Sequence, residues 1–262
     1  MDPADAYQPD RSLKGKIRRR AVRLVHRRPL AQAPERPMVS FTFDDAPASA
    51  VTTGVALLEA RGARGVFYVS AGLCGQEGPM GTYAQPADYQ ALAAAGHEIA
   101  CHTFSHLDCG RASGAAAEAD ADRNLAAFKA WNTGRVTSFA YPYGDVAAGP
   151  KGRLAGRYAT LRALHHGLIE AGSDLNQLPA VGIEGPDGEA VARAWLDRAL
   201  ARKAWLILYT HDVREPPSPW GCTPGALARL IDHAQTGGAE ILTTAEAAAR
   251  LGVSAGGTAA AA

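Results

Sequence analysis

The sequence lacks the features of secreted, membrane-spanning and disulfide-stabilised proteins. Its 262 residues include only four cysteines, and no apolar run reaches the length of about 18 residues that a transmembrane helix needs. The start, Met1-Asp2-Pro3-Ala4-Asp5, lacks the basic-then-apolar order of a secretory leader, so we expect a cytoplasmic protein. The cysteines show no zinc-site spacing, and a reducing compartment would keep them as free thiols.

With 47% hydrophobic residues, the chain can bury one large core. Short β-branched or aromatic runs alternate with alanine-rich stretches, which is typical of βα units around a parallel sheet. The expected strands are 38–43, 65–70, 97–101, 137–141, 158–163, 180–183, 205–210 and 240–243, and the expected helices are 50–61, 86–95, 115–131, 188–202, 223–235 and 244–250. We predict an α/β fold, a (β/α) barrel of seven to eight strands. A doubly wound open sheet would give a similar pattern.

Charge is distributed unevenly along the chain. Residues 1–36 hold 10 Lys and Arg against 4 Asp and Glu, so this extension is strongly basic although the whole chain carries only +1. Apolar residues recur at helical spacing among the basic ones from Leu13 to Val25, which predicts a short amphipathic helix. Residues 11–28 could lie on an anionic membrane or pack under the barrel. Nucleic acid is disfavoured, because no aromatic residues are interleaved with the charges.

These patterns divide the chain into three parts. Residues 1–36 form the basic N-terminal extension, residues 37–252 the barrel, and residues 253–262, rich in glycine and alanine, a disordered tail.

Ionisable side chains stand directly after several expected strands. Asp44 and Asp45 end the first strand, His102 follows the third and His211 follows the seventh. The carboxyl ends of the strands carry the active site in a βα barrel. We therefore predict a catalytic site at this edge.

The segment His102-Thr103-Phe104-Ser105-His106 places two imidazoles four residues apart, at a spacing that one helical turn brings to one face. Together with one aspartate from another strand end, they would bind a divalent metal and leave positions open for catalysis. Consecutive aspartates at an irregular strand end point in different directions. One of the pair can therefore ligate the metal while the other faces a water. The same ligand types form the facial triad of iron oxygenases, but no cosubstrate motif supports that alternative.

Four segments carry a family resemblance. They are Thr42-Phe43-Asp44-Asp45, His102 to His106, Tyr141-Pro142-Tyr143-Gly144 and Leu208-Tyr209-Thr210-His211. In order and spacing, from about residue 38 to 250, they resemble the motifs of the NodB-homology polysaccharide deacetylases, carbohydrate esterase family four. The resemblance implies a distorted, incomplete (β/α) barrel that removes N-acetyl groups from amino sugars with a bound divalent metal.

The resemblance also implies a role for each matching residue. It assigns the general base to Asp44, the general acid to His211, the metal ligands to Asp45, His102 and His106, an oxyanion contact to the backbone N–H of Tyr143, and the shape of that turn to Pro142. Zinc is the expected metal, and cobalt or nickel would fit the same ligands. Pro142 and Tyr143 would line the substrate cleft, and Trp220, in the loop after His211, would stack on a sugar ring.

The sequence departs from the family pattern in two places. Where many members carry an arginine that pairs with the base, two residues before the proline of the third motif, this chain has Ala140. Either Asp44 works without an arginine, or another one reaches it, and Arg162 on the next expected strand is the candidate. The fourth motif, which tunes the acid histidine, is not recognisable. Asp174 is the nearest carboxylate along the chain, although its surroundings also suit a simple turn.

These observations favour a deacetylase acting on an N-acetylated glycan or a lipid-linked oligosaccharide precursor, such as a bacterial exopolysaccharide or holdfast-type adhesin. The reaction would take place in the cytoplasm, including the inner face of the membrane. A metal-dependent amidohydrolase acting on a small non-sugar amide is the main alternative, because the same barrel and ligands can serve other C–N bonds. A non-catalytic glycan-binding protein is a third interpretation.

Overall fold

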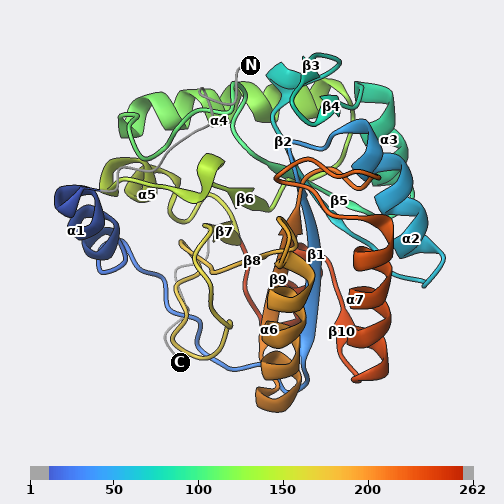
Figure 1. Cartoon of the computed structure of the whole chain (residues 1–262). Coiled ribbons are helices and arrows are strands. Elements are labelled where there is room, and N and C mark those ends of the chain that lie inside the picture. The colour runs from blue at the N-terminus through green and yellow to red at the C-terminus, as the bar shows by residue number, and fades with distance from the viewer. Residues whose placement is uncertain (1–11, 256–262) are drawn as a thin grey trace.

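A curled parallel sheet forms the centre of the computed structural model, which describes residues 12–255 (Figure 1). Its strands follow the order β7-β6-β5-β2-β1-β9-β8, and β10 also pairs with β1. They are β1 (Met38–Asp44), β2 (Val66–Val69), β5 (Glu98–Cys101), β6 (Ser138–Ala140), β7 (Thr160–Arg162), β8 (Val181–Gly182), β9 (Trp205–Thr210) and β10 (Glu240–Ile241). Seven of them fall within the segments that the sequence predicts, and β1 extends one residue beyond its predicted segment, to Asp44. A separate hairpin, β3 (Glu77–Gly78) with β4 (Gly81–Thr82), was not expected.

The two edges of the sheet approach each other through the chain that leads into β8. Leu178 bridges Arg162 of β7 in parallel, and its N–H donates to the carbonyl of Leu161 at 2.8 Å. The N–H of Ala163 in turn donates to the carbonyl of Leu178 at 2.9 Å. The predicted distorted (β/α) barrel is therefore confirmed, and the open doubly wound alternative is wrong.

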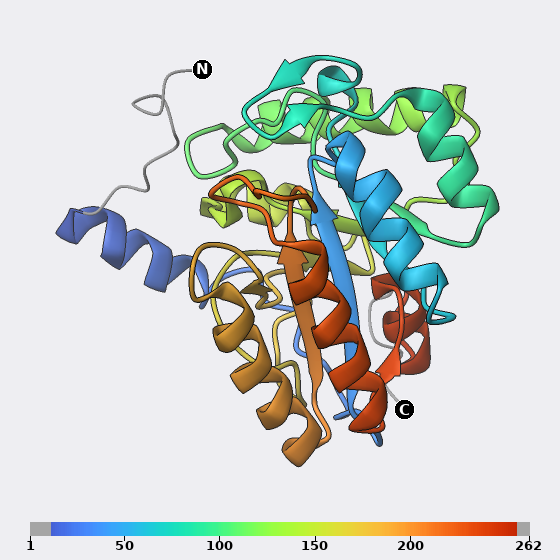
Figure 2. The same cartoon turned by 45° about the vertical axis from the view of Figure 1, so that its right-hand side comes forward.

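Helices cover the outside of the sheet, with α2, α6 and α7 standing side by side and α4 packed on α5 (Figures 1 and 2). The helices are α1 (Leu13–Val22), α2 (Val55–Glu59), α3 (Pro86–Ala94), α4 (Gly114–Ala130), α5 (Ala148–Leu154), α6 (Gly188–Arg202), α7 (Pro224–Thr236) and α8 (Thr244–Arg250). Short turns complete them: a π-helical turn at Ala50–Gly54 that leads into α2, and 3₁₀ turns at Ala71–Leu73 and Pro142–Gly144. The sequence predicts these helices except α5.

Strand β1 contributes side chains both to the hydrophobic core and to the candidate site. Successive side chains of a strand point to opposite faces. Val39, Phe41 and Phe43 are buried in the outer core against the helices, and the Phe43 ring stacks on Phe67 at 4.9 Å between centroids. Burial of each such phenylalanine contributes roughly 1.5–3 kcal/mol. The alternate side chains face the barrel interior, where Ser40 accepts a hydrogen bond from the Trp205 indole. Asp44 ends this inner row.

The N-terminal extension contains α1, which starts at a Ser12 cap. Leu13 and Ile17 are exposed, whereas Val22 is buried and its carbonyl accepts a hydrogen bond from Lys151 Nζ at 2.9 Å. The first 11 residues of the extension and residues 256–262 of the expected disordered tail lie outside the described residues. Among residues 12–255, no helix is long and apolar enough to cross a bilayer. All four cysteines are free.

Candidate active site and metal centre

The Asp44 carboxylate lies at the end of β1, inside the barrel, and is 2% exposed. Arg162 of β7 donates from Nη2 to both carboxylate oxygens, at 2.6 and 2.7 Å. The guanidinium lies over the rings of Tyr68 and Tyr209, 4.7 and 5.5 Å from their centroids. Burial alone would raise the pKa of Asp44, but the charge of Arg162, with His102 and His211, brings it below the usual value. Asp44 is therefore ionised at neutral pH, as a general base requires.

Sheet register explains how Arg162 reaches this place. Ala140 of β6 and Arg162 of β7 are paired in register, so their side chains leave the sheet on the same side. Neighbouring strands are about 4.8 Å apart, a separation that a long arginine side chain spans easily. Arg162 therefore places its guanidinium where, in the family pattern, an arginine at position 140 would place it. The small side chain of Ala140 leaves this space free.

Asp45 and the two histidines lie within ligand distance of one metal ion. The Oδ1 atom of Asp45 lies 3.8 Å from Nε2 of His102 and 3.5 Å from Nε2 of His106. Ligand atoms about 2.1 Å from a tetrahedral zinc are about 3.4 Å apart, close to these separations. Oδ1 of Asp45 is buried and accepts no hydrogen bond, an arrangement that costs free energy unless a ligand completes it. The three residues thus fit a divalent metal.

His102 is prepared for such a role by its surroundings. Its ring nitrogen Nδ1 lies 2.8 Å from the carbonyl oxygen of Ala140, which can only accept, so Nδ1 carries the proton and Nε2 presents its lone pair. Burial lowers the pKa of His102 to about 4, so the ring is neutral at pH 7. A neutral, oriented imidazole is the form that binds metal.

The loop between the two histidines is fixed by Asp120 of α4. Its Oδ1 accepts from the N–H groups of Phe104 and Ser105 at 2.8 and 2.9 Å. The loop is not the helical turn that the sequence spacing suggested, because Thr103 and His106 adopt left-handed backbone conformations with φ of 61° and 54°. The two imidazoles nevertheless converge, with ring centroids 5.0 Å apart.

The turn at Pro142 and Tyr143 forms a further wall of the site. Tyr143 has φ of 60°, is 40% exposed, and its ring meets His106 edge-on at 4.4 Å. Gly144 follows with φ of 65°, and a Cβ there would lie 2.3 Å from Leu164, so only glycine fits. The turn thus presents an aromatic side chain to solvent beside His106.

His211 follows β9 and is held by the loop that the sequence singled out for Trp220. The Trp220 carbonyl accepts from the backbone N–H of His211 at 3.1 Å and lies 3.1 Å from its Nδ1. This leaves Nε2 of His211 available to a substrate. Oε2 of Glu184 lies 3.8 Å from the same Nδ1, and Oε1 accepts from the Tyr209 hydroxyl at 2.8 Å.

Glu184 is the site residue that sequence reasoning missed. It lies two residues after β8, at the same carboxyl edge as the other site residues, so the strand-end rule applied to this very short strand would have found it. Burial raises its pKa, although His211 and Tyr209 act in the opposite direction. Its Oε2 atom is buried without a hydrogen-bond partner.

Asp174, the nearest carboxylate by chain order, does not approach His211. It accepts from Lys151 Nζ at 2.7 Å and from the N–H of Arg28 at 2.9 Å, and so ties the N-terminal extension to the barrel. Asp212 is fully buried and accepts from the N–H of Ser218, which fixes the loop after β9.

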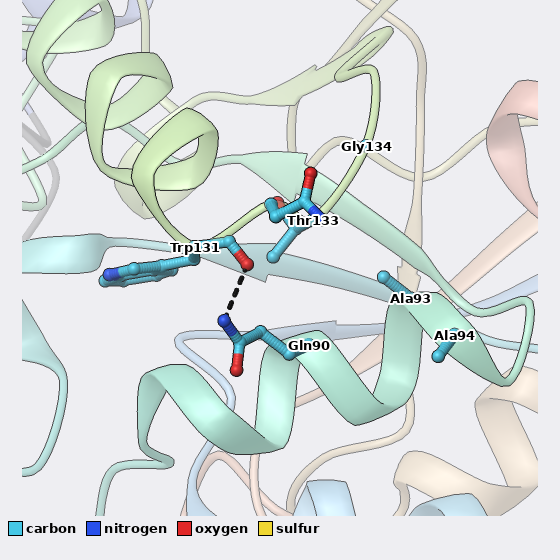
Figure 3. A pocket seen from close by; sticks show the side chains of 7 residues that line it. Gln90, Ala93, Ala94, Trp131, Thr133 and Gly134 are labelled. Carbon is cyan, nitrogen blue, oxygen red and sulfur yellow. Dashed lines mark hydrogen bonds between the residues drawn. The ribbon is translucent and has the colours of Figure 1, made fainter.

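A pocket of about 350 Å³ lies away from these residues, between α3 and the end of α4 (Figure 3). Gln90 donates to the Trp131 carbonyl at 2.9 Å at its edge, and the Trp131 indole stacks on Tyr89. None of its lining residues belongs to the site described above.

Comparison with known proteins gives one family. Residues 31–154 match the family model for polysaccharide deacetylase, a segment that includes Asp44, Asp45, His102, His106 and Tyr143, while Arg162 and His211 lie beyond it. A search among curated proteins found no match.

Solved structures share the fold at low sequence identity. A polysaccharide deacetylase from Mycobacterium smegmatis, described as putative, aligns with a TM-score of 0.65 at 18% identity, over 86% of this chain and 94% of that one. A chitin deacetylase from Colletotrichum lindemuthianum gives 0.57 at 20%, over 82% and 89%. A family 4 acetyl xylan esterase from Clostridium thermocellum, in complex with cobalt, gives 0.56 at 19%, over 80% and 89%. The family model thus covers slightly less than half of the chain, and these solved structures show that the chain has the fold of the polysaccharide deacetylases of carbohydrate esterase family four.

Proposed function

We propose that this protein removes N-acetyl groups from amino sugars of a bacterial polysaccharide or its precursor, by metal-dependent hydrolysis. One observation carries the proposal. The ionised Asp44 lies beside the buried, unpartnered Asp45 oxygen and two convergent imidazoles, and His211 is close enough to act on the Asp44 charge. A base, a metal site and an acid thus share one strand edge, a combination that a purely glycan-binding protein does not need.

The chain's own groups account for the proton movements. When bound by Asp45, His102 and His106, a divalent metal supplies an acidified water and polarises the acyl carbonyl. Asp44 accepts the proton of the attacking water, and its ion pair with Arg162 keeps it ionised for that step. The backbone N–H of Tyr143 stabilises the developing oxyanion, a kind of contact worth about 3 kcal/mol where one donor has been deleted.

Collapse of the tetrahedral species needs an acid, because an amine leaves only when it is protonated. His211, in its protonated form, donates from Nε2 to the leaving nitrogen, while Nδ1 stays bonded to the Trp220 carbonyl. Glu184, 3.8 Å from Nδ1, stabilises the imidazolium. It thereby takes the part that the fourth family motif would supply.

Several finer features belong to the same proposal. Zinc is the resident metal, with cobalt as a functional substitute, in line with the cobalt complex of the acetyl xylan esterase. Trp220 and Tyr143 contact the sugar ring. The substrate is an N-acetylated glycan, a class supported by the chitin deacetylase neighbour, and it is met in the cytoplasm while still attached to a lipid carrier at the inner face of the membrane.

The test is acetate release from N-acetylglucosamine oligomers by metal-stripped protein reloaded with zinc or cobalt. Asp44→Asn and His211→Ala should each lose at least about a hundredfold in kcat/KM, the scale of a lost general base or acid. His233→Ala, which changes a partly exposed histidine paired with Asp197 on the outer helices, is the matched control and should retain full activity.

Parallel assays on acetylated xylan and on cyclic imides and ureides separate the alternatives. Hydrolysis of an imide or ureide without acetate release from the oligomers would assign the site to a small non-sugar amide. Metal-independent release, or full activity of Asp44→Asn, would refute the mechanism.

A further inference from the structure

The apolar face of α1 is turned to solvent. Leu13, Ile17 and Leu24 are 75%, 58% and 77% exposed, and Val25 is 39% exposed. Leu13 and Ile17 are one helical turn apart on α1, and Leu24 and Val25 follow in the turn after it. Within residues 12–255, four of the six exposed large hydrophobic side chains come from this short stretch. They form a concentrated apolar patch, which marks interaction surfaces in soluble proteins.

The helix is fixed to the barrel in this orientation. Val22 is buried, and its carbonyl is held by Lys151. Arg18 donates to the carbonyl of Gly110 and forms an ion pair with Asp145. Figures 1 and 2 show α1 standing out from the body of the molecule beside α5. The apolar face is thus presented outward by a docked helix.

A basic pocket of about 330 Å³ adjoins the end of this face. Its lining includes Arg23, Leu24, Arg27, His165 and His166. Asp174 also lines it, but the buried Lys151 is paired with that carboxylate, so the two arginines leave the pocket net positive. The exposed Arg20 adds to the positive charge beside it. Apolar side chains next to a pocket with two guanidinium groups match the two parts of an anionic phospholipid, acyl chain and phosphate.

We propose that α1 and this pocket bind the surface of an anionic phospholipid bilayer. Leu13, Ile17 and Leu24 enter the interface between headgroups and acyl chains, and a lipid phosphate lies between Arg23 and Arg27. Arginines near an anionic leaflet each strengthen binding by about fivefold, and partly inserted apolar side chains add to this.

Docking in this way would place the loops next to the active site close to the bilayer. The two groups that Arg18 contacts, Gly110 and Asp145, follow His106 and Tyr143 by a few residues, so α1 touches the loops that carry the site. Access to a lipid-attached glycan would follow. This consequence rests on the proposed function, whereas the lipid binding itself does not.

Co-sedimentation of the full chain with phosphatidylglycerol/phosphatidylcholine vesicles, beside pure phosphatidylcholine vesicles, tests the proposal. The wild type should bind the anionic vesicles preferentially and lose binding at high salt. R23Q/R27Q should weaken binding by about 25-fold, and I17S/L24S by at least about tenfold. V191S/R193Q is the matched control, because it changes one exposed valine and one exposed arginine on α6, and it should bind like the wild type.

Three outcomes would overturn the proposal: no preference for anionic vesicles, variants that bind like the control, or concentration-dependent dimerisation that I17S/L24S abolishes without any vesicle binding. The last would assign the face to a second copy of the chain. Acetate release from soluble oligomers should be unchanged in all three double variants, which also verifies that they fold. Vesicle binding by a protein that releases no acetate would refute the proposed function alone.

Discussion

Replacing Arg162 with methionine would leave the Asp44 carboxylate buried without its guanidinium partner. Asp44 is 2% exposed, and the pair is joined at 2.6 and 2.7 Å, so solvent cannot take over the lost interaction. Removal of one partner of a buried ion pair costs about 3 kcal/mol or more. Without the guanidinium, burial is the dominant influence on Asp44 and raises the pKa of its carboxyl.

The sign of the pH effects follows from the direction of this shift. In the wild type, the lowered pKa of Asp44 stabilises the fold above the unfolded value of about 3.9, and the stabilisation is lost as pH falls through the folded pKa. In Arg162→Met, burial dominates and the pKa lies above the unfolded value. The variant should therefore be destabilised at pH 7, and its deficit should shrink as pH falls and Asp44 takes up a proton.

The pH dependence of kcat/KM should also show the change in the pKa of Asp44. Because the base must be ionised, the acid limb of the profile should move to higher pH in Arg162→Met. Arg162→Lys keeps the charge and should move the limb less. The double variant Ala140→Arg/Arg162→Met restores an arginine from the in-register position and should return the limb toward the wild type. An unmoved acid limb in Arg162→Met would refute the assignment of Arg162 as the partner of the base.

Three further predictions concern other parts of the site and its support. Chelation should lower the thermal unfolding midpoint and zinc should restore it, because a metal that binds only the folded state stabilises that state. In His106→Ala, zinc should no longer restore the midpoint. If the midpoint of this variant rises with zinc as much as that of the wild type, His106 is not a ligand. Glu184→Gln removes the carboxylate 3.8 Å from His211 and should lower kcat with little change in KM, because the protonated imidazole that acts as the acid loses a stabilising charge. A rise in KM with kcat unchanged would indicate only a packing role in the cleft. Lys151→Met should lower the free energy of unfolding in urea by about 3 kcal/mol, because it leaves the Asp174 carboxylate and the Val22 carbonyl without their donor. A loss below about 1 kcal/mol would show that water replaces the ammonium group.

Sequence patterns located the strands well because their apolar runs are buried on both sides. All eight strands of the sheet were predicted, and Asp44, Asp45, His102 and His211 stand at the strand ends as expected. The helix α5 was missed because its sequence contains Gly149, Pro150 and Gly152, which local propensity disfavours. Packing of α5 against α4 overrides that propensity.

Within the site, spacing predicted which residues meet but not how the backbone brings them together. Asp45, Thr103, His106 and Tyr143 all have positive φ without being glycine, so the ligating loops follow no regular periodicity that a sequence window could detect. Glu184 directly follows the expected strand 180–183, but a lone glutamate at a strand end has no motif or ligand spacing that marks it as a site residue. Its place depends on long-range pairing with β9, which local sequence does not encode.

The pairing of Ala140 with Arg162 has a consequence for how such enzymes are searched for. A functional group carried by a long side chain can pass, over evolutionary time, from one strand to its neighbour without moving in space, provided that both positions share a layer of the barrel. A search that reads each motif along one stretch of chain would score this protein as lacking its arginine. A search that asks whether any residue paired in register on a neighbouring strand supplies the positive charge would find Arg162. Such a search would separate enzymes in which the arginine has changed strand from proteins that have lost it.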